Sequence, residues 1–247
     1  MHEHSEATRS NGVKKYYGKW PFLRVFGMQE FFSVLFSLGN LYVHRAGYMH
    51  LIQTMNMIRL KDSCISLYTY FYYLNIATWL SSAAFHARDK PLTQFFDYSL
   101  ALANVIYMAY IAIVRVFVNL GPEFLRLLAL ILGIYWAIHM YIMQVYHFDY
   151  SKHMKLCGFF AAVQTFVWIF WSFIENRSSE ELSHLYWFLE VMLLSVLVSA
   201  ADFPPFFCKL LDSHALWHAI TMFAFPSYWY FLEYELIFSK HRRHALF

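Results

Sequence analysis

Three histidines in this chain have the residue type and spacing of metal ligands. His214 and His218 stand four residues apart, so on a helix their imidazoles lie on one face about one turn from each other. That spacing lets a helix offer two imidazoles to one zinc ion. His86 completes a set of three, which leaves zinc one open tetrahedral position for water. A site of this kind lowers the pKa of the bound water to about 7 and makes hydroxide available near neutral pH.

Two further side chains have the chemistry that such a metal site uses. Asp97 is the candidate base that takes the proton of the water or holds the hydroxide in place. Ser82 precedes His86 by one helical turn and can hydrogen-bond that water, or the oxyanion formed at an ester carbonyl. The hypothesis is hydrolysis of an acyl bond in a lipid. Its catalytic residues are Asp97 and Ser82, and its zinc ligands are His86, His214 and His218.

Each of these residues also has an ordinary structural explanation. Two histidines one turn apart are often incidental, and a single histidine at the end of a membrane span, such as His86, is often an interfacial side chain. Ser82 alone is a helix-packing hydroxyl, and Asp97 alone is the N-cap of a helix. The metal hypothesis depends on all of them occurring together on one side of a membrane.

The composition predicts a membrane protein. Of 247 residues, 60% are hydrophobic and 14% are charged, whereas soluble domains have about 25% charged residues. Four windows without Asp, Glu, Lys or Arg have about the 17–25 residues that a spanning helix needs. They are 63–85, 98–114, 127–146 and 156–174. Three weaker windows contain ionisable residues, and they are 26–44, 185–201 and 213–232. Leaving the weaker windows in water would expose long apolar runs, so we expect an all-α fold with seven transmembrane helices.

Seven alternating spans fix which segments share a side of the membrane. The end of the second span with His86, the start of the third with Asp97 and the start of the seventh with His214 all lie on the N-terminal side. Residues far apart in the sequence can therefore form one zinc site at that side of the bundle. The first residues lack the apolar core of a signal peptide, so we expect insertion to begin with the first span. The expected divisions are a polar tail, one transmembrane hydrolase domain and a basic tail, at 1–19, 20–238 and 239–247.

The remaining polar residues indicate structure more than chemistry. Glu30 and Glu190 lie inside predicted spans, where a hydrogen bond is the default role of a carboxylate and contact with a substrate headgroup or a cation is the alternative. His139 lies in mid-span and is expected to be a packing residue, whereas His44 and His153 are expected to be solvated. The net charge of +3, without a long basic run, does not indicate a nucleic-acid partner. Three widely spaced cysteines indicate neither a disulfide framework nor a cysteine zinc site.

The site residues and several flanking motifs together resemble one known family. The SxxxH sequence, an Asp eleven positions later and a late HxxxH are typical of a seven-helix hydrolase superfamily that includes alkaline ceramidases and adiponectin-type receptors. Within it, the flanking motifs resemble the post-GPI attachment to proteins factor 3 family, over residues 18 to about 235. These motifs are GKWPF at 18–22, FHARD at 85–89, DY at 97–98, FDY at 148–150, DFPP at 202–205 and DSHALWH at 212–218.

That resemblance implies a GPI-specific phospholipase A2, which removes the sn-2 acyl chain from a GPI anchor after its attachment to protein. It implies zinc on the three histidines, Ser82 and Asp97 in the active site, and GPI-anchored proteins with their lipid anchors as substrates. It also implies a Golgi or endoplasmic reticulum membrane, with the active site and the N-terminus in the lumen and the C-terminus in the cytosol. Members of that family usually carry a signal peptide and a cysteine-rich segment before the GKWPF motif, and residues 1–17 do not show these features.

Two other functions fit the same residues. The same zinc chemistry could cleave the amide of ceramide, although the KWPF and DFPP motifs favour the GPI anchor. The second is a non-enzymatic lipid-binding receptor or chaperone that keeps zinc for structure. In that case Asp97→Asn would leave function intact, while changes to the histidines would destroy folding.

Overall fold

The computed structural model describes residues 9–10, 13–15, 19–59, 64–174 and 178–245. Within these residues the chain forms seven α-helices, a short 3-10 helix η1 (Val118–Leu120) and a hairpin of β1 (Arg9–Ser10) and β2 (Val13–Lys14). The helices are α1 (Phe31–Met57), α2 (Cys64–Ala87), α3 (Pro91–Val116), α4 (Pro122–Val145), α5 (Tyr150–Ile174), α6 (Ser179–Ala200) and α7 (Ser213–Ala245). The expected all-α architecture is confirmed, with the addition of this small hairpin.

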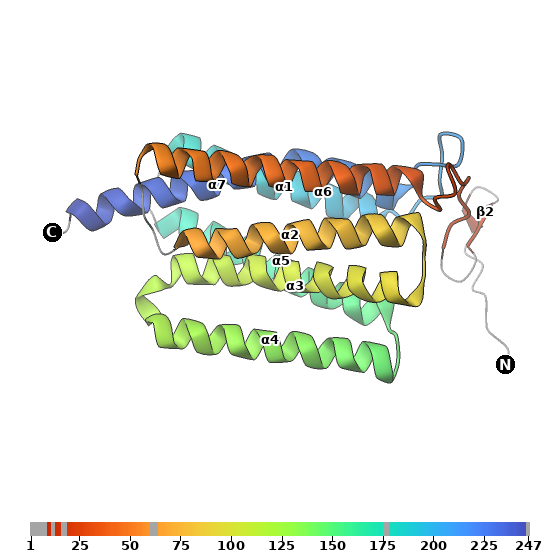
Figure 1. Ribbon diagram of the computed structural model, residues 1–247, viewed down its shortest axis with the longest axis horizontal. Coiled ribbons are helices and arrows are strands. Elements are labelled where there is room, and N and C mark those ends of the chain that lie inside the picture. Colours follow the sequence, from red (N-terminus) through yellow and green to blue (C-terminus); the bar gives the residue numbers. More distant parts are fainter. Residues whose placement is uncertain (1–8, 11–12, 16–18, 60–63, 175–177, 246–247) are drawn as a thin grey trace.

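The seven helices lie along one common axis, and successive helices run in opposite directions (Figure 1). Odd-numbered helices begin, and even-numbered helices end, at the end of the bundle where the N-terminal hairpin lies. This arrangement brings together the C-terminal end of α2 and the N-terminal ends of α3 and α7. These are the segments that carry the predicted site, so their expected grouping at one end of the bundle is observed.

Local sequence explains where two of the helices begin. At the start of α7 the carboxylate of Asp212 accepts a hydrogen bond from the N–H of Ala215 at 2.8 Å, which caps the first turn. Pro122 opens α4 directly after Gly121, whose φ of 84° lies in the region that glycine adopts without strain. The cap at Asp212 fixes the first turn of α7, and with it the position of His214.

Among the described residues, four helices are long and apolar enough to cross a membrane, namely α3, α4, α5 and α6. They indicate a membrane protein. Residues 64–85 of the charge-free window 63–85 lie in α2, which is not one of the four. Residues 185–200 of the weaker window 185–201 lie in α6, which is one of them. Tyr, Thr, Ser and Asn side chains make α2 less apolar even without charges. In α6 the many Leu and Val residues keep the mean hydropathy high despite the single carboxylate of Glu190.

Two helices extend beyond the spans that the sequence predicts. The first predicted span, 26–44, differs from the helix at both ends, because α1 begins at Phe31 and continues to Met57. The basic tail expected at 239–247 is helical over most of its length, since α7 continues to Ala245. Hydropathy predicts only the part of a helix that lies in the hydrocarbon core of the bilayer. The helix itself can extend beyond the bilayer, as long as its backbone hydrogen bonds continue.

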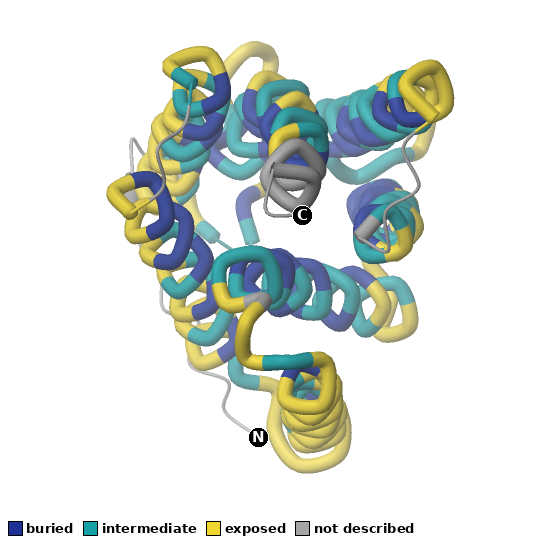
Figure 2. The backbone as a smooth tube through the Cα atoms, turned by 90° about the vertical axis from the view of Figure 1, so that its left-hand side faces the viewer, coloured by how far each residue is buried: buried dark blue, intermediate teal, exposed yellow. Residues whose placement is uncertain are grey.

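The packed core lies among α1, α2, α3, α5, α6 and α7 and is rich in aromatic side chains. Its largest fully buried members include Trp168, Trp229, Tyr68, Tyr228 and Phe71. In contrast, α4 lies at the edge of the bundle, at the bottom of Figure 2, where most of its length is exposed. Only 6% of its most apolar window is buried, against 50% for α3. The apolar surface of α4 is therefore available to lipid.

Candidate metal centre

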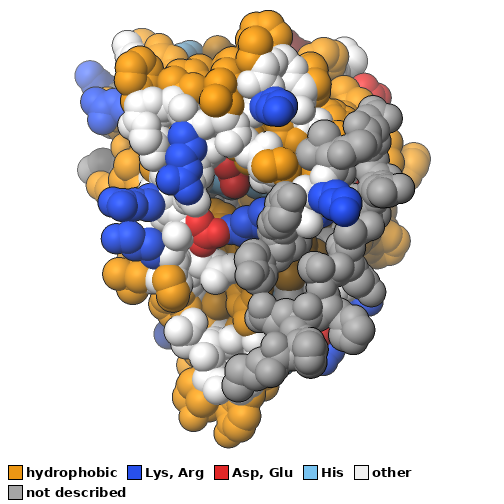
Figure 3. Space-filling view, turned by 90° about the vertical axis from the view of Figure 1, so that its right-hand side faces the viewer, with side chains coloured by type: hydrophobic (Ala, Val, Ile, Leu, Met, Phe, Trp, Pro, Cys, Tyr) orange, Lys and Arg blue, Asp and Glu red, His pale blue; other side chains and the backbone are white. Residues whose placement is uncertain are grey.

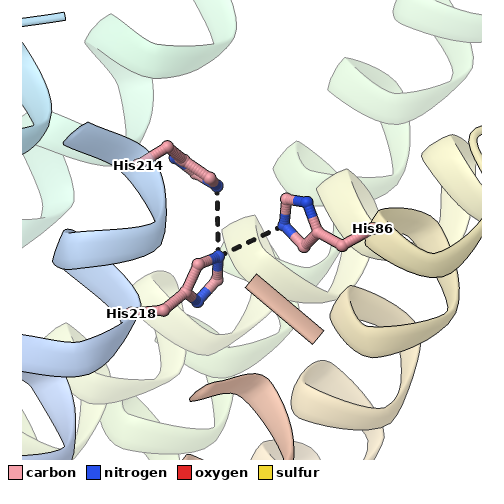
Figure 4. A group of neighbouring side chains, drawn as sticks. All are labelled: His86, His214 and His218. Carbon is pink, nitrogen blue, oxygen red and sulfur yellow. Dashed lines mark hydrogen bonds between the residues drawn. The ribbon is translucent and has the colours of Figure 1, made fainter. Parts of the chain in front are cut away.

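The three predicted histidine ligands meet at the end of the bundle where the N-terminal hairpin lies. His86 comes from the last turn of α2, and His214 and His218 come from the first two turns of α7. The Nε2 atom of His218 lies 3.2 Å from Nε2 of His86 and 3.1 Å from Nε2 of His214 (Figure 4). The potential ligand atoms of the three residues all lie within 4.8 Å of one another. The rings thus direct their Nε2 atoms toward one shared position.

The geometry of this cluster fits a zinc ion. In a tetrahedral site with Zn–N distances of about 2.0–2.1 Å, two ligand nitrogens stand about 3.3 Å apart. The observed Nε2–Nε2 distances of 3.1 and 3.2 Å are close to that value. His86 and His218 are only 3% and 2% exposed, and buried imidazole nitrogens that face one another need a cation or a shared proton between them. Three imidazoles are also a ligand set of catalytic zinc.

Glu30, immediately before α1, contacts the cluster through His86. Its Oε2 atom lies 2.7 Å from His86 Nδ1, and Ser33 Oγ donates to the same oxygen at 3.3 Å. The backbone N–H of Glu30 also donates to the carbonyl of His86 at 3.1 Å. A carboxylate on Nδ1 fixes the orientation of the ring and leaves Nε2 to face the other two histidines. The hydrogen-bonding role expected for Glu30 is confirmed, and its partner is a candidate metal ligand.

Polar side chains hold the backbone of α7 at His218. Asn40 Nδ2 donates to the carbonyl of His218 at 2.7 Å, and Thr221 Oγ1 donates to Asn40 Oδ1 at 3.1 Å. The Nδ1 atom of His218 is buried and has no hydrogen-bond partner among the described residues. Its ring packs edge-on against Trp79, with 5.4 Å between ring centroids. His218 is therefore oriented by its backbone and by packing, whereas His86 is oriented by a carboxylate.

Asp97, the predicted base, lies near the start of α3 and is 9% exposed. The charges of His86, Glu30 and Lys19 act on its carboxylate, but no hydrogen bond between Asp97 and the three histidines is recorded among the described residues. Its alternative interpretation as the N-cap of the third helix is wrong, because α3 begins at Pro91. Asp97 is thus a buried carboxylate that does not cap α3.

Ser82 lies on the side of α2 that faces α1. Its Oγ atom is 3.1 Å from Ser37 Oγ, and Ser37 in turn donates to the carbonyl of Ser33 at 2.7 Å. Ser82 is buried, one turn before His86. These contacts agree with the helix-packing interpretation of Ser82, and its catalytic role stays a prediction.

The contacts of Glu30 and α1 with the cluster could have been predicted from a pattern in the sequence, although not from the spacing of histidine pairs. Polar residues recur every three or four positions along this apolar segment, and they are Glu30, Ser33, Ser37, Asn40 and His44. The last four of them have 0% exposure. Such spacing is typical of one face of a helix. Here that face meets α2 and α7, which carry the histidines.

The other polar predictions have mixed outcomes. Glu190 is exposed on α6, and no hydrogen bond of its side chain is recorded among the described residues. His139 Nε2 lies 3.3 Å from His153 Nδ1, in agreement with a packing role for His139. The expectation that His44 and His153 are solvated is wrong, because they are 0% and 2% exposed. Since α1 continues past His44, that ring lies inside the bundle, where it accepts a hydrogen bond from Trp229 Nε1 at 3.2 Å.

Two ionisable groups outside the helices border the cluster, and burial shifts the pKa of both. Burial lowers the pKa of Lys19, while the carboxylates of Glu30 and Asp97 act in the opposite direction. Burial raises the pKa of Asp212 to about 6, and the hydrogen bond from the N–H of Ala215 opposes that shift. Burial thus disfavours the charged form of both groups beside the histidines.

Comparison with known proteins identifies the family. Residues 1–236 of the chain match the Per1-like family, so the match includes all three histidines of the cluster. The chain belongs to the Per1-like family. Similar curated proteins include Post-GPI attachment to proteins factor 3 of Drosophila melanogaster, 32% identical over 214 residues, and Protein PER1 homolog of Schizosaccharomyces pombe, 32% identical over 221 residues. GPI-specific phospholipase A2-like PGAP3 of Mus musculus is 27% identical over 238 residues. The resemblance to the post-GPI attachment to proteins factor 3 family is confirmed.

This Per1-like chain spans less than two thirds of the Drosophila and Schizosaccharomyces proteins. The two alignments each cover 85% of this chain and 63% of the relative. The alignment with the mouse protein covers 95% of this chain and 72% of that protein. The shared part thus makes up most of this chain.

Proposed function

We propose that this Per1-like protein is a zinc-dependent acyl hydrolase that removes the sn-2 fatty acid from GPI anchors during their remodelling. The observation that carries the proposal is the convergence of His86, His214 and His218 at one end of a helix bundle with an apolar surface. Three imidazoles leave a catalytic zinc ion one open position. The names of the relatives, which include GPI-specific phospholipase A2-like PGAP3, support the substrate class.

In this proposal the three histidines hold zinc, and Glu30 keeps one of them in place. When bound, the ion supplies a Lewis acid and lowers the pKa of water to about 7. The contact of Glu30 with Nδ1 of His86 leaves Nε2 as the only ring nitrogen free to act as a ligand. His214 and His218 are placed by the capped first turns of α7.

Asp97 is the candidate proton acceptor of the reaction. Its buried carboxylate lies within electrostatic range of His86. Such a group can take a proton from the attacking water and return it to the departing glycerol oxygen. The water oxygen bonds to the acyl carbon, the bond from that carbon to the glycerol oxygen breaks, and a fatty acid and a lyso-lipid result. Ser82 would stabilise the oxyanion only if its hydroxyl turned away from Ser37.

We further propose that all seven helices cross a Golgi or endoplasmic reticulum membrane. The N-terminus and the metal centre then lie in the lumen, and the C-terminus lies in the cytosol. Four helices are apolar enough by composition alone. The other three, α1, α2 and α7, turn polar residues such as Asn40, Asn75 and Thr221 toward the bundle interior, where they are buried. Polar groups satisfied between helices in this way are compatible with a lipid environment.

The test is lipid mass spectrometry of GPI anchors in cells that lack their own remodelling enzyme. We expect the unmutated chain to restore loss of the sn-2 acyl chain, and His86→Ala to abolish it because one metal ligand is missing. Asp97→Asn should lower turnover by about 10²–10⁴-fold, the usual contribution of a general base. His139→Ala is the matched control, since it removes a histidine of α4 that lies outside the cluster.

Three outcomes would contradict the proposal. Full turnover by His86→Ala would exclude a metal centre on these histidines. Full function of Asp97→Asn, together with misfolding of the histidine variants, would indicate a structural zinc site in a non-enzymatic protein. Release of fatty acid from ceramide, with GPI anchors unchanged, would instead indicate an amidase.

A further inference from the structure

A cavity of about 250 Å³ lies next to the metal centre, at the same end of the bundle. The residues of its lining that matter here are Lys19, Trp20, Arg24, Gln29, Glu30 and Asp89. Figure 3 shows this end of the molecule, where Lys and Arg side chains surround a hollow in which an acidic side chain is visible. The lining includes Lys19, Trp20, Pro21 and Phe22 of the GKWPF motif, which take no part in the hydrolytic chemistry above.

The cavity is built on two segments that are held by hydrogen bonds. Trp20 Nε1 donates to Asp202 Oδ1 at 3.1 Å, and the N–H of Leu23 donates to the carbonyl of Lys209 at 3.0 Å. These contacts join the GKWPF segment to the loop of the DFPP motif, between α6 and α7. The two motifs therefore form one structural unit beside the cavity.

Glu30 connects the cavity to the histidine cluster. This side chain lines the cavity, and its Oε2 atom lies 2.7 Å from His86 Nδ1. The backbone of Gln29 also donates to the carbonyl of Ala87 at 3.2 Å, next to His86. A ligand in the cavity is thus separated from the metal ligand His86 by a single side chain.

Two cationic side chains reach this cavity. Lys19 forms an ion pair with Asp89, and its Nζ atom lies 4.6 Å from the centroid of the Phe85 ring. Arg24 is exposed, and no ion pair is recorded for it in the part of the chain that the structure describes. Lys19 and Arg24 line the cavity together with the carboxylates of Glu30 and Asp89. Because Asp89 already pairs with Lys19, Arg24 is the cation best suited to bind a phosphate, through two parallel hydrogen bonds of its guanidinium group.

We propose that this cavity binds the phosphodiester of the substrate's headgroup, with Lys19 and Arg24 as its cationic groups. The inference rests on the proposed function and extends it to substrate recognition. In a glycerophospholipid the phosphate is attached to the carbon next to the one that bears the sn-2 ester. A phosphate site must therefore lie directly beside the hydrolytic centre, as this cavity does. Ceramide has no phosphate, so the same site discriminates against it.

The experiment measures binding of dihexanoyl-phosphatidylinositol to the purified 247-residue chain by calorimetry, with dihexanoylglycerol as the lipid without phosphate. Lys19→Gln and Arg24→Gln should each weaken binding of the phosphatidylinositol by about tenfold or more, since each removes a charge-assisted contact. Binding of dihexanoylglycerol should not change. Lys19→Arg should retain most of the affinity because it keeps the charge.

The matched control is Lys155→Gln, which removes an exposed positive charge near the start of α5, outside the lining of the cavity. An equal loss of affinity in Lys155→Gln would indicate a general effect of surface charge and overturn the inference. Equal losses for both lipids would overturn it too, because they would indicate damage to the site itself. If inorganic phosphate bound as tightly as the lipid, the cavity would be a site for free anions and the headgroup assignment would be wrong.

Binding and turnover test the two proposals separately. A chain that binds phosphatidylinositol through Lys19 and Arg24, but releases no fatty acid from GPI anchors, would contradict the proposed function and support this inference. A chain that releases the fatty acid, but loses no affinity in Lys19→Gln and Arg24→Gln, would support the proposed function and contradict this inference.

Discussion

Glu30 shows how one side chain can serve both structure and chemistry in this protein. Its carboxylate bonds to Nδ1 of His86, and its backbone N–H bonds to the carbonyl of the same residue. The first contact selects which ring nitrogen faces the other histidines, and the second fixes where the end of α2 stands relative to α1. A carboxylate in an apolar segment is costly, and the hydrogen bond to His86 gives this one a partner.

Glu30→Gln should lower zinc affinity by about 10–100-fold, because the amide is a weaker acceptor and no longer holds the His86 ring in one orientation. Zinc content after competition with a chelator would measure this. Glu190→Gln is the matched control, since it neutralises the other carboxylate inside a predicted span at an exposed position of α6. Unchanged zinc affinity in Glu30→Gln would mean that packing alone orients His86.

The position of the site also depends on how closely α1 and α7 approach each other. Two glycines of α1 allow this contact. A Cβ atom on Gly47 would lie 2.4 Å from the Trp229 ring, and one on Gly39 would lie 2.5 Å from the terminal methyl group of Met222. The indole is rigid and buried, whereas the methionine side chain can move aside. The two glycines therefore differ in how strictly the helix pair requires them.

Gly47→Ala should destabilise the protein by about 1–3 kcal/mol, the usual result of overpacking a well-filled interior. Gly39→Ala should have a smaller effect, because Met222 can adopt another rotamer. Thermal unfolding in detergent, compared for the two variants, would check the difference. Equal melting temperatures for Gly47→Ala and the unmutated chain would show that α1 and α7 are not in tight contact at Trp229.

At the scale of the whole molecule, the two ends of the bundle differ in character. One end carries the histidine cluster, the cavity and the N-terminal hairpin, and the other end carries the connection between α5 and α6. The sequence Asn176-Arg177-Ser178 in that connection is a glycosylation sequon. Asn176 lies outside the described residues, but α5 ends and α6 begins at the end of the bundle opposite the histidine cluster.

If the metal centre faces the lumen, Asn176 should carry no glycan, because its connection then lies in the cytosol. Val13→Thr would convert the sequence after Asn11 into a sequon on the other side, and this variant should acquire a glycan. The measurement is the shift in electrophoretic mobility on glycosidase treatment. A shift in the unmutated chain that Asn176→Gln removes would reverse the proposed orientation.

The amino-acid sequence by itself determined which residues could form the metal cluster and at which end of the bundle they would meet. The spacing of His214 and His218 is a local property of one helix. The grouping with His86 follows because successive spans cross the membrane in opposite directions. The end of the second span and the start of the seventh therefore lie on the same side. Neither inference needs to know how any two helices pack. The structure has the three histidines together for these reasons.

The tertiary structure alone decided which side chains touch across helices. It placed Glu30 on His86, turned Ser82 toward Ser37, and joined the GKWPF motif to the DFPP loop beside a cavity. Such contacts depend on the rotation and relative height of neighbouring helices. These are set by how the side chains of both helices fill the space between them. The periodicity of a single segment carries no information about that fit, which is why the three contacts emerge only from the folded chain.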